Sequence, residues 1–124
     1  MANPNIAAMT SMYGNSASVS LTTTNATSIV NNAAASGKVF KINSLMVANV
    51  DGSAAANITI NIYSQDDLGG TAFPIASTVA VPADASLIVI DKTTAIYLKE
   101  DQSIGAIAGT ASDLVVTASW EEIS

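Results

Sequence analysis

The hydrophobic positions of this chain recur every second residue in short runs, and turns of only a few residues separate the runs. The clearest run is 57–64, where Ile58, Ile60 and Ile62 alternate with polar residues, as in a half-buried antiparallel strand. No stretch of a dozen residues holds a 3.6-residue apolar period, which excludes a helical domain. About eight strands at spacings of roughly 8–12 residues predict one antiparallel β-sandwich, and we expect jelly-roll connectivity.

The stretch 79–104 is the most regularly patterned part of the chain. It indicates four strands joined by a Pro turn, a polar turn and an acidic turn. Residues 87–90 are continuously apolar, which predicts a central strand covered on both faces. Two further strands then each have one apolar face, which we expect to point into the core. These faces are Ile104, Ala106 and Ala108, and Leu114, Val116, Ala118 and Trp120.

The segment 38–50 predicts the first strong strand of the sandwich. One face holds mainly apolar side chains, namely Phe40, Ile42, Met46, Ala48 and Val50. The opposite face becomes apolar halfway along, at Leu45 and Val47, so another element or another subunit must cover it there. We therefore expect Leu45 and Val47, together with Tyr63 on the outer face of the next strand, to contact a partner.

Residues 1–16 show no periodicity and form a separate N-terminal arm, followed by the sandwich domain at 17–124. The arm carries Ile6, Met9, Met12 and Tyr13, which are too apolar for a solvated tail. Two interpretations remain open, a free tail and an arm that docks on a neighbouring subunit. Under the second interpretation these four side chains are partner contacts.

The low charge of the chain favours an assembly component. Charged residues make up 11%, against a usual share of about 25%. A surface of Ala, Ser, Thr and Asn is easily desolvated against a partner. The net charge of −6 and the absence of Arg argue against binding to nucleic acid. No apolar run approaches a membrane span and no signal peptide is recognisable, so we expect assembly in a cytoplasm.

Candidate chemistry is sparse, because the chain contains no His and no Cys. General bases, thiol nucleophiles and zinc ligands of those types are therefore missing. The paired carboxylates at 66–67, 100–101 and 121–122 lie in turns or at a strand end, where solvated roles are expected. A calcium site at 65–70 is a weak alternative, since the loop lacks alternating Asp residues. We expect no cofactor, no metal and no enzymatic activity.

Four pieces of the sequence carry a family resemblance, at 40–52, 81–91, 96–98 and 111–124. They include Val-Pro-Ala-Asp-Ala-Ser-Leu-Ile-Val-Ile-Asp and a closing Trp-Glu-Glu-Ile-Ser. In this order they resemble small β-sandwich virion structural proteins of tailed bacteriophages, particularly marine and cyanobacterial ones. Two departures are visible: the acidic turn is Glu-Asp-Gln in place of Glu-Gly-Asp, and Trp120 stands where Tyr is typical.

The resemblance implies a structural component of a tailed-phage virion, either a capsid decoration (cement) protein or a small neck or tail component. It implies a homo-oligomer, with a trimer favoured, that contacts other virion proteins but neither nucleic acid nor membrane. The expected location is the virion, after synthesis in the host cytoplasm. The alternative is a receptor- or carbohydrate-binding module of a tail fibre, which would use Asp66, Asp67 or Tyr97.

Overall fold

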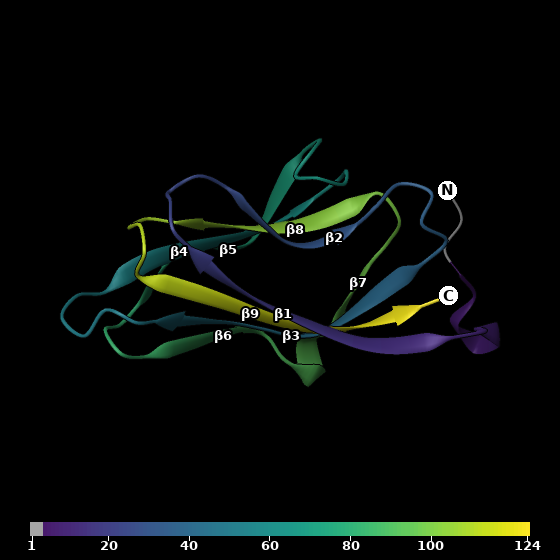
Figure 1. Cartoon of the computed structure of the whole chain (residues 1–124), viewed down its shortest axis with the longest axis horizontal. Coiled ribbons are helices and arrows are strands. Elements are labelled where there is room, and N and C mark those ends of the chain that lie inside the picture. The colour runs from purple at the N-terminus through teal and green to yellow at the C-terminus, as the bar shows by residue number, and fades with distance from the viewer. Residues whose placement is uncertain (1–3) are drawn as a thin grey trace.

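A computed structural model describes residues 4–124, which form a sandwich of two antiparallel sheets (Figure 1). The strands are β1 (Met12–Leu21), β2 (Thr27–Asn32), β3 (Val39–Asn49), β4 (Ala56–Tyr63), β5 (Ala72–Val81), β6 (Ser86–Ile90), β7 (Ile96–Leu98), β8 (Gln102–Ala108) and β9 (Leu114–Ile123), and the short 3-10 helices are η1 (Ile6–Ala8) and η2 (Lys92–Thr94). Sheet A has the order β1-β9-β3-β6, with β7 also paired to β3. Sheet B has the order β2-β8-β4-β5.

The connectivity is that of a jelly roll, as predicted. The chain crosses between the sheets after most strands, and β4 and β5 form a hairpin within sheet B. Strands β6 and β7 both pair with β3, at different points along it, so they are two parts of one jelly-roll strand. The break between them is η2, which Asp91 caps by accepting hydrogen bonds from the backbone N–H groups of Thr93 and Thr94.

The core lies between the two sheets, which form two layers, one above the other, in Figure 1. Strands β8 and β9 alternate as expected. Their predicted inner-face residues are all buried: Ile104, Ala106, Ala108, Leu114, Val116, Ala118 and Trp120. Trp120 stacks on Phe40 of β3, with ring centroids 6.2 Å apart. These strands are therefore the part of the fold that simple alternation predicts most directly.

Strand β3 departs from the predicted alternation because it contains a bulge. Its register with β9 shifts between Ile42 and Ser44, which leaves Asn43 as an extra residue. Before the bulge Ile42 points into the core, and after it the inward positions are Leu45 and Val47. A one-residue shift exchanges the two faces of a strand. The predicted outer-face position of Leu45 and Val47 is therefore wrong.

Strand β6 is also placed differently from the prediction. The apolar run at 87–90 does not form a central strand, since β6 lies at the edge of sheet A. A register shift opposite β3 turns Ile90 into the core and leaves Ile88 63% exposed. The continuous apolar run thus combines an inward face, an irregular position and one outward side chain.

The N-terminal part of the chain contributes more to the sandwich than expected. Strand β1 begins at Met12, so 12–16, predicted to belong to the arm, pair with β9. Residues 1–3 of the predicted arm lie outside the described residues. Within residues 4–124 the only helices are short 3-10 turns, too short to cross a membrane.

Candidate subunit-contact surfaces

Part of the outer face of sheet A is uncharged across four strands. Cross-strand pairing fixes one row as Ser18, Thr117, Met46 and Ile88. The rows on either side share the same small or apolar character: Ser20, Val115, Ala48 and Ser86, then Ser16, Ser119 and Ser44. None of these side chains is ionisable. We call these three rows the uncharged face.

Two large apolar side chains stand out from the uncharged face. Met46 is 40% exposed and Ile88 is 63% exposed, and they are direct cross-strand partners. Around them are hydroxyl and methyl groups, including a hydrogen bond of 3.0 Å between the Ser18 and Thr117 hydroxyls. An apolar pair surrounded by small neutral groups costs little to desolvate. The sequence pattern missed both residues. Uninterrupted alternation, which overlooks the bulge, assigned Met46 to the core, and the continuous apolar run at 87–90 predicted that Ile88 would be covered.

The N-terminal segment folds back on its own sandwich. The backbone N–H groups of Thr10 and Ser11 donate to the carbonyl of Ser124, at 2.7 and 3.0 Å. Pro4 and Ile6 line a shallow pocket of about 300 Å³, which they share with Val39, Tyr97 and Lys99. The segment therefore lies against the end of sheet A, a position that neither interpretation from the sequence includes.

This segment explains why the outer side of sheet A is buried at one end. Val39 and Ile123 are cross-strand partners, and each is only 3% exposed. Both lie outside the main core cluster between the sheets. Of the predicted contact residues, Ile6, Met9, Met12 and Tyr13 stay exposed, Tyr13 by 67%. Their role as partner contacts stays a prediction.

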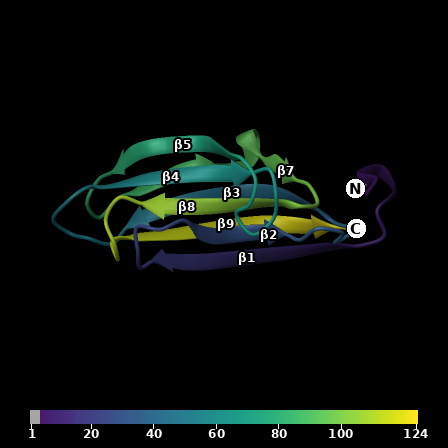
Figure 2. The ribbon, with the colours of Figure 1, turned by 90° about the horizontal axis from the view of Figure 1, so that it is seen from above.

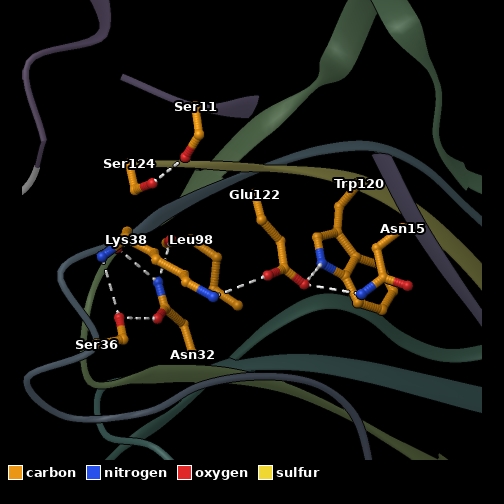
Figure 3. A network of polar contacts seen from close by, with 9 residues as sticks. All are labelled: Ser11, Asn15, Asn32, Ser36, Lys38, Leu98, Trp120, Glu122 and Ser124. Atoms are coloured by element: carbon orange, nitrogen blue, oxygen red, sulfur yellow. Dashed lines mark hydrogen bonds and ion pairs between the residues drawn. The ribbon is translucent and has the colours of Figure 1, made fainter. Parts of the chain in front are cut away.

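A polar network fastens this end of the sandwich (Figure 3). Glu122 accepts hydrogen bonds from Asn15 Nδ2 at 2.8 Å and Trp120 Nε1 at 3.3 Å, and it forms an ion pair with Lys38 at 3.3 Å. Burial disfavours the charged carboxylate, but the hydrogen bonds from Asn15, Lys38 and Trp120 and the charge of Lys38 together lower the pKa of Glu122. The Glu122 carboxylate therefore has a structural role, since it links β1, β9 and the start of β3.

Tyr63, the remaining predicted contact, is on the outer side of sheet B but is buried. The β4–β5 loop folds back over it, and Leu68 lies beside it. Gly105 makes this possible: a Cβ there would come within 2.6 Å of Leu68 Cδ2 and 3.0 Å of Tyr63 Cε2. The loop is pinned by Ser103, whose hydroxyl donates to the Gln65 carbonyl and accepts from the Leu68 N–H. Tyr63 is therefore covered by its own chain.

The acidic residues of that loop make internal hydrogen bonds. Asp66 accepts from the Ala34 N–H and Asp67 from Asn31 Nδ2, each at 3.0 Å. Tyr97, the other residue of the carbohydrate-binding alternative, is in sheet A, whereas this loop joins two strands of sheet B. The structure thus does not bring them together. Across residues 4–124 there is no group of three or more acidic side chains that could hold a metal ion.

Comparison with known proteins gives a likeness of fold. No protein-family model matches the chain, and no curated protein sequence matches it. Among solved structures, a chain of Bacillus endospore appendages, which are disulfide-linked pili, is 14% identical with a TM-score of 0.51, covering 91% of this chain and 88% of that one. A chain from the capsid of Helicobacter pylori bacteriophage KHP30 is 7% identical with the same TM-score, covering 94% and 90%. The chain therefore shares its fold with subunits of a phage capsid and of a pilus.

Proposed function

We propose that this chain is a structural subunit of a virion, either a capsid decoration (cement) protein or a small neck or tail component. The observation that carries the proposal is the uncharged face of sheet A. A protein with a net charge of −6 keeps three rows of that face free of charge, with Met46 and Ile88 in the middle row. The fold shared with a phage capsid chain supports the same role.

The proposed mechanism is passive. Rigid sandwiches join through surfaces whose small side chains lose little conformational entropy on contact, and water leaves the interface. We infer a symmetric homo-oligomer, with a trimer favoured, that contacts other virion proteins. The role requires no catalysis, nucleic acid or membrane, and we place the finished subunit in the virion after synthesis in the host cytoplasm.

The virion role is tested on purified particles from the source of this sequence. Mass spectrometry is expected to detect the chain, and antibodies against it are expected to label the particles in electron micrographs. Repeated absence of the chain from intact particles would overturn the proposal.

The uncharged face is tested with the double variant Met46→Lys and Ile88→Lys. Its incorporation into particles is expected to fall by roughly tenfold or more, because burying an unpaired charge costs more than 1.4 kcal/mol. The control, Asn25→Lys with Thr110→Lys, adds the same charge on exposed loop residues and is expected to incorporate normally. Equal incorporation of both double variants would contradict a contact through this face.

A further inference from the structure

Strand β1 is an edge strand with none of the usual protection against pairing. It has ten residues in unbroken register with β9, and it contains neither Pro nor a charged side chain. Long, regular, uncharged edges are templates for another strand, and most proteins block them with Pro, charge, bulges or short length. Figure 2 shows β1 along one side of the molecule, with no described strand beyond it.

The other edges of the two sheets are each interrupted. Strand β2 has six residues and a register shift at Ile29. Strand β5 contains Pro74 and two register shifts, and Thr78 adopts a positive φ of 51°. The remaining edge of sheet A is divided between β6 and β7 by η2. Among the described strands, β1 therefore presents the one continuous edge.

The hydrogen bonds show which groups of β1 point away from the sheet. Ser11 and Ser124 exchange two backbone hydrogen bonds, each 3.0 Å long, so they form a hydrogen-bonded pair. Such pairs alternate along an antiparallel ladder, which makes the odd-numbered residues of β1 the partners of β9. The even-numbered residues, from Met12 to Ser20, therefore direct their N–H and C=O groups outward. Consistent with this, the Ser16 N–H is met only by the neighbouring Asn15 side chain, at 2.9 Å.

We propose that β1 pairs antiparallel with β1 of a second copy of this chain, about a two-fold axis at Ser16. In this register Ser16 faces its own copy, Gly14 faces Ser18, and Met12 faces Ser20. All are even-numbered, so their outward backbone groups form the new ladder. The outer faces of the two sheets A then become one continuous surface. This contact is independent of the virion role, and it can also link larger oligomers pairwise.

Side-chain chemistry selects this register and a second copy as the occupant. Tyr13 is 67% exposed, and here it lies directly opposite the half-buried Val19 of the other copy, a favourable aromatic–β-branched pair. A shift of two residues places Tyr13 opposite either Ala17 or Leu21, which is already buried. Of the two carboxylates on β9, Glu122 forms an ion pair with Lys38, and Glu121, the cross-strand partner of Gly14, accepts a hydrogen bond from Asn43. In the proposed register Gly14 faces Ser18 of the other copy, so neither carboxylate lies directly opposite a carboxylate of that copy.

The test uses single cysteines, because the natural chain has none. In the variant Ser16→Cys the two Cα atoms are about 5.5 Å apart, within disulfide range. In the control Ser20→Cys, also exposed on β1, they are roughly 27 Å apart at 3.4 Å per residue. Under mild oxidation Ser16→Cys is expected to form dimers on the order of a hundredfold faster, since pairing holds the thiols at a high effective concentration.

A second variant addresses the edge without cysteine. Ser18→Pro removes an N–H that points outward, so the ladder to β9 stays intact while the new ladder loses a donor. Sedimentation is expected to give the wild-type assembly twice the mass of the Ser18→Pro assembly, with nearly the same melting temperature. A monomeric wild-type protein, or equal cross-linking of Ser16→Cys and Ser20→Cys, would overturn the proposal.

Discussion

At the scale of single residues, two buried asparagines fasten the crossings between the sheets. Asn32 Nδ2 donates to the carbonyls of Lys38 and Leu98, at 3.0 and 3.1 Å (Figure 3). Asn49 Nδ2 donates to the carbonyls of Ala54 and Val81, and its Oδ1 accepts from the Asp51 N–H. Each amide lies at the end of a strand in one sheet and binds a strand carbonyl of the other sheet together with backbone groups of the connecting loop. The loops are thus fixed by side chains rather than by turn geometry alone.

The variant Asn49→Ala is expected to lower the free energy of unfolding by about 2–3 kcal/mol, because it leaves buried backbone groups without partners. Urea denaturation followed by tryptophan fluorescence measures the change. Asn25→Ala is the control, since Asn25 is exposed in the β1–β2 loop and its side chain is free of hydrogen bonds to residues 4–124. Similar stabilities of the two variants would show that Asn49 does not fasten the crossing.

The contribution of Glu122 to the stability of the fold depends on pH. Its pKa is lowered from the ordinary value of 4.5, so the folded state favours the carboxylate. A lowered pKa stabilises the fold above the ordinary value, and this contribution is lost as pH falls through the folded-state pKa. The stability difference between the wild type and Glu122→Gln is therefore expected to be constant above about pH 5 and to shrink below pH 4. Urea titrations at several pH values test this, and a constant difference down to pH 2 would contradict it.

At the scale of elements, Gly105 determines how the β4–β5 loop packs on sheet B. Gly105→Ala is expected to destabilise the fold by about 1–3 kcal/mol, because its methyl group would collide with Leu68 and Tyr63. Leu68→Ala removes the nearer obstacle, so the double variant should lose less than the sum of the single changes. A double-mutant cycle by urea denaturation measures this coupling. If the two losses of stability simply add, Leu68 does not pack against residue 105.

The sequence predicted those strands whose alternation is uninterrupted. Strands β8 and β9 followed the pattern, and so did the overall sandwich. Strand β3 did not, because its bulge at Asn43 exchanges the faces and both faces appear apolar around it. Local pattern cannot locate such a bulge, which depends on the register with β9. Gly105 within a strand was a usable sign of close approach. Because Gly105 lies on the outer face of sheet B, this sign would have predicted that another segment packs over that face, beside Tyr63.

At the scale of the whole molecule, the segment before β1 is expected to add stability to its own subunit. Removing 1–9 keeps the hydrogen bonds of Thr10 and Ser11 to Ser124 but uncovers Val39. We expect a loss of about 1–2 kcal/mol, the value of partly exposing one aliphatic side chain. Denaturation measures it, with Met9→Ser as a control that alters the segment outside the pocket. An unchanged free energy of unfolding would instead favour docking on a neighbour.

The order of the strands also governs how the protein is made. Strand β9 lies between β1 and β3 in sheet A, yet it is the last of the three to leave the ribosome. At roughly 5–20 residues per second, β1 waits for several seconds before its partner is synthesised. During that time both of its edges are open, and neither sheet A nor the core beneath it can close. Newly made chains are therefore most prone to mispairing just before β9 emerges. At that stage a chaperone that covers the edges of β1 would have its largest effect.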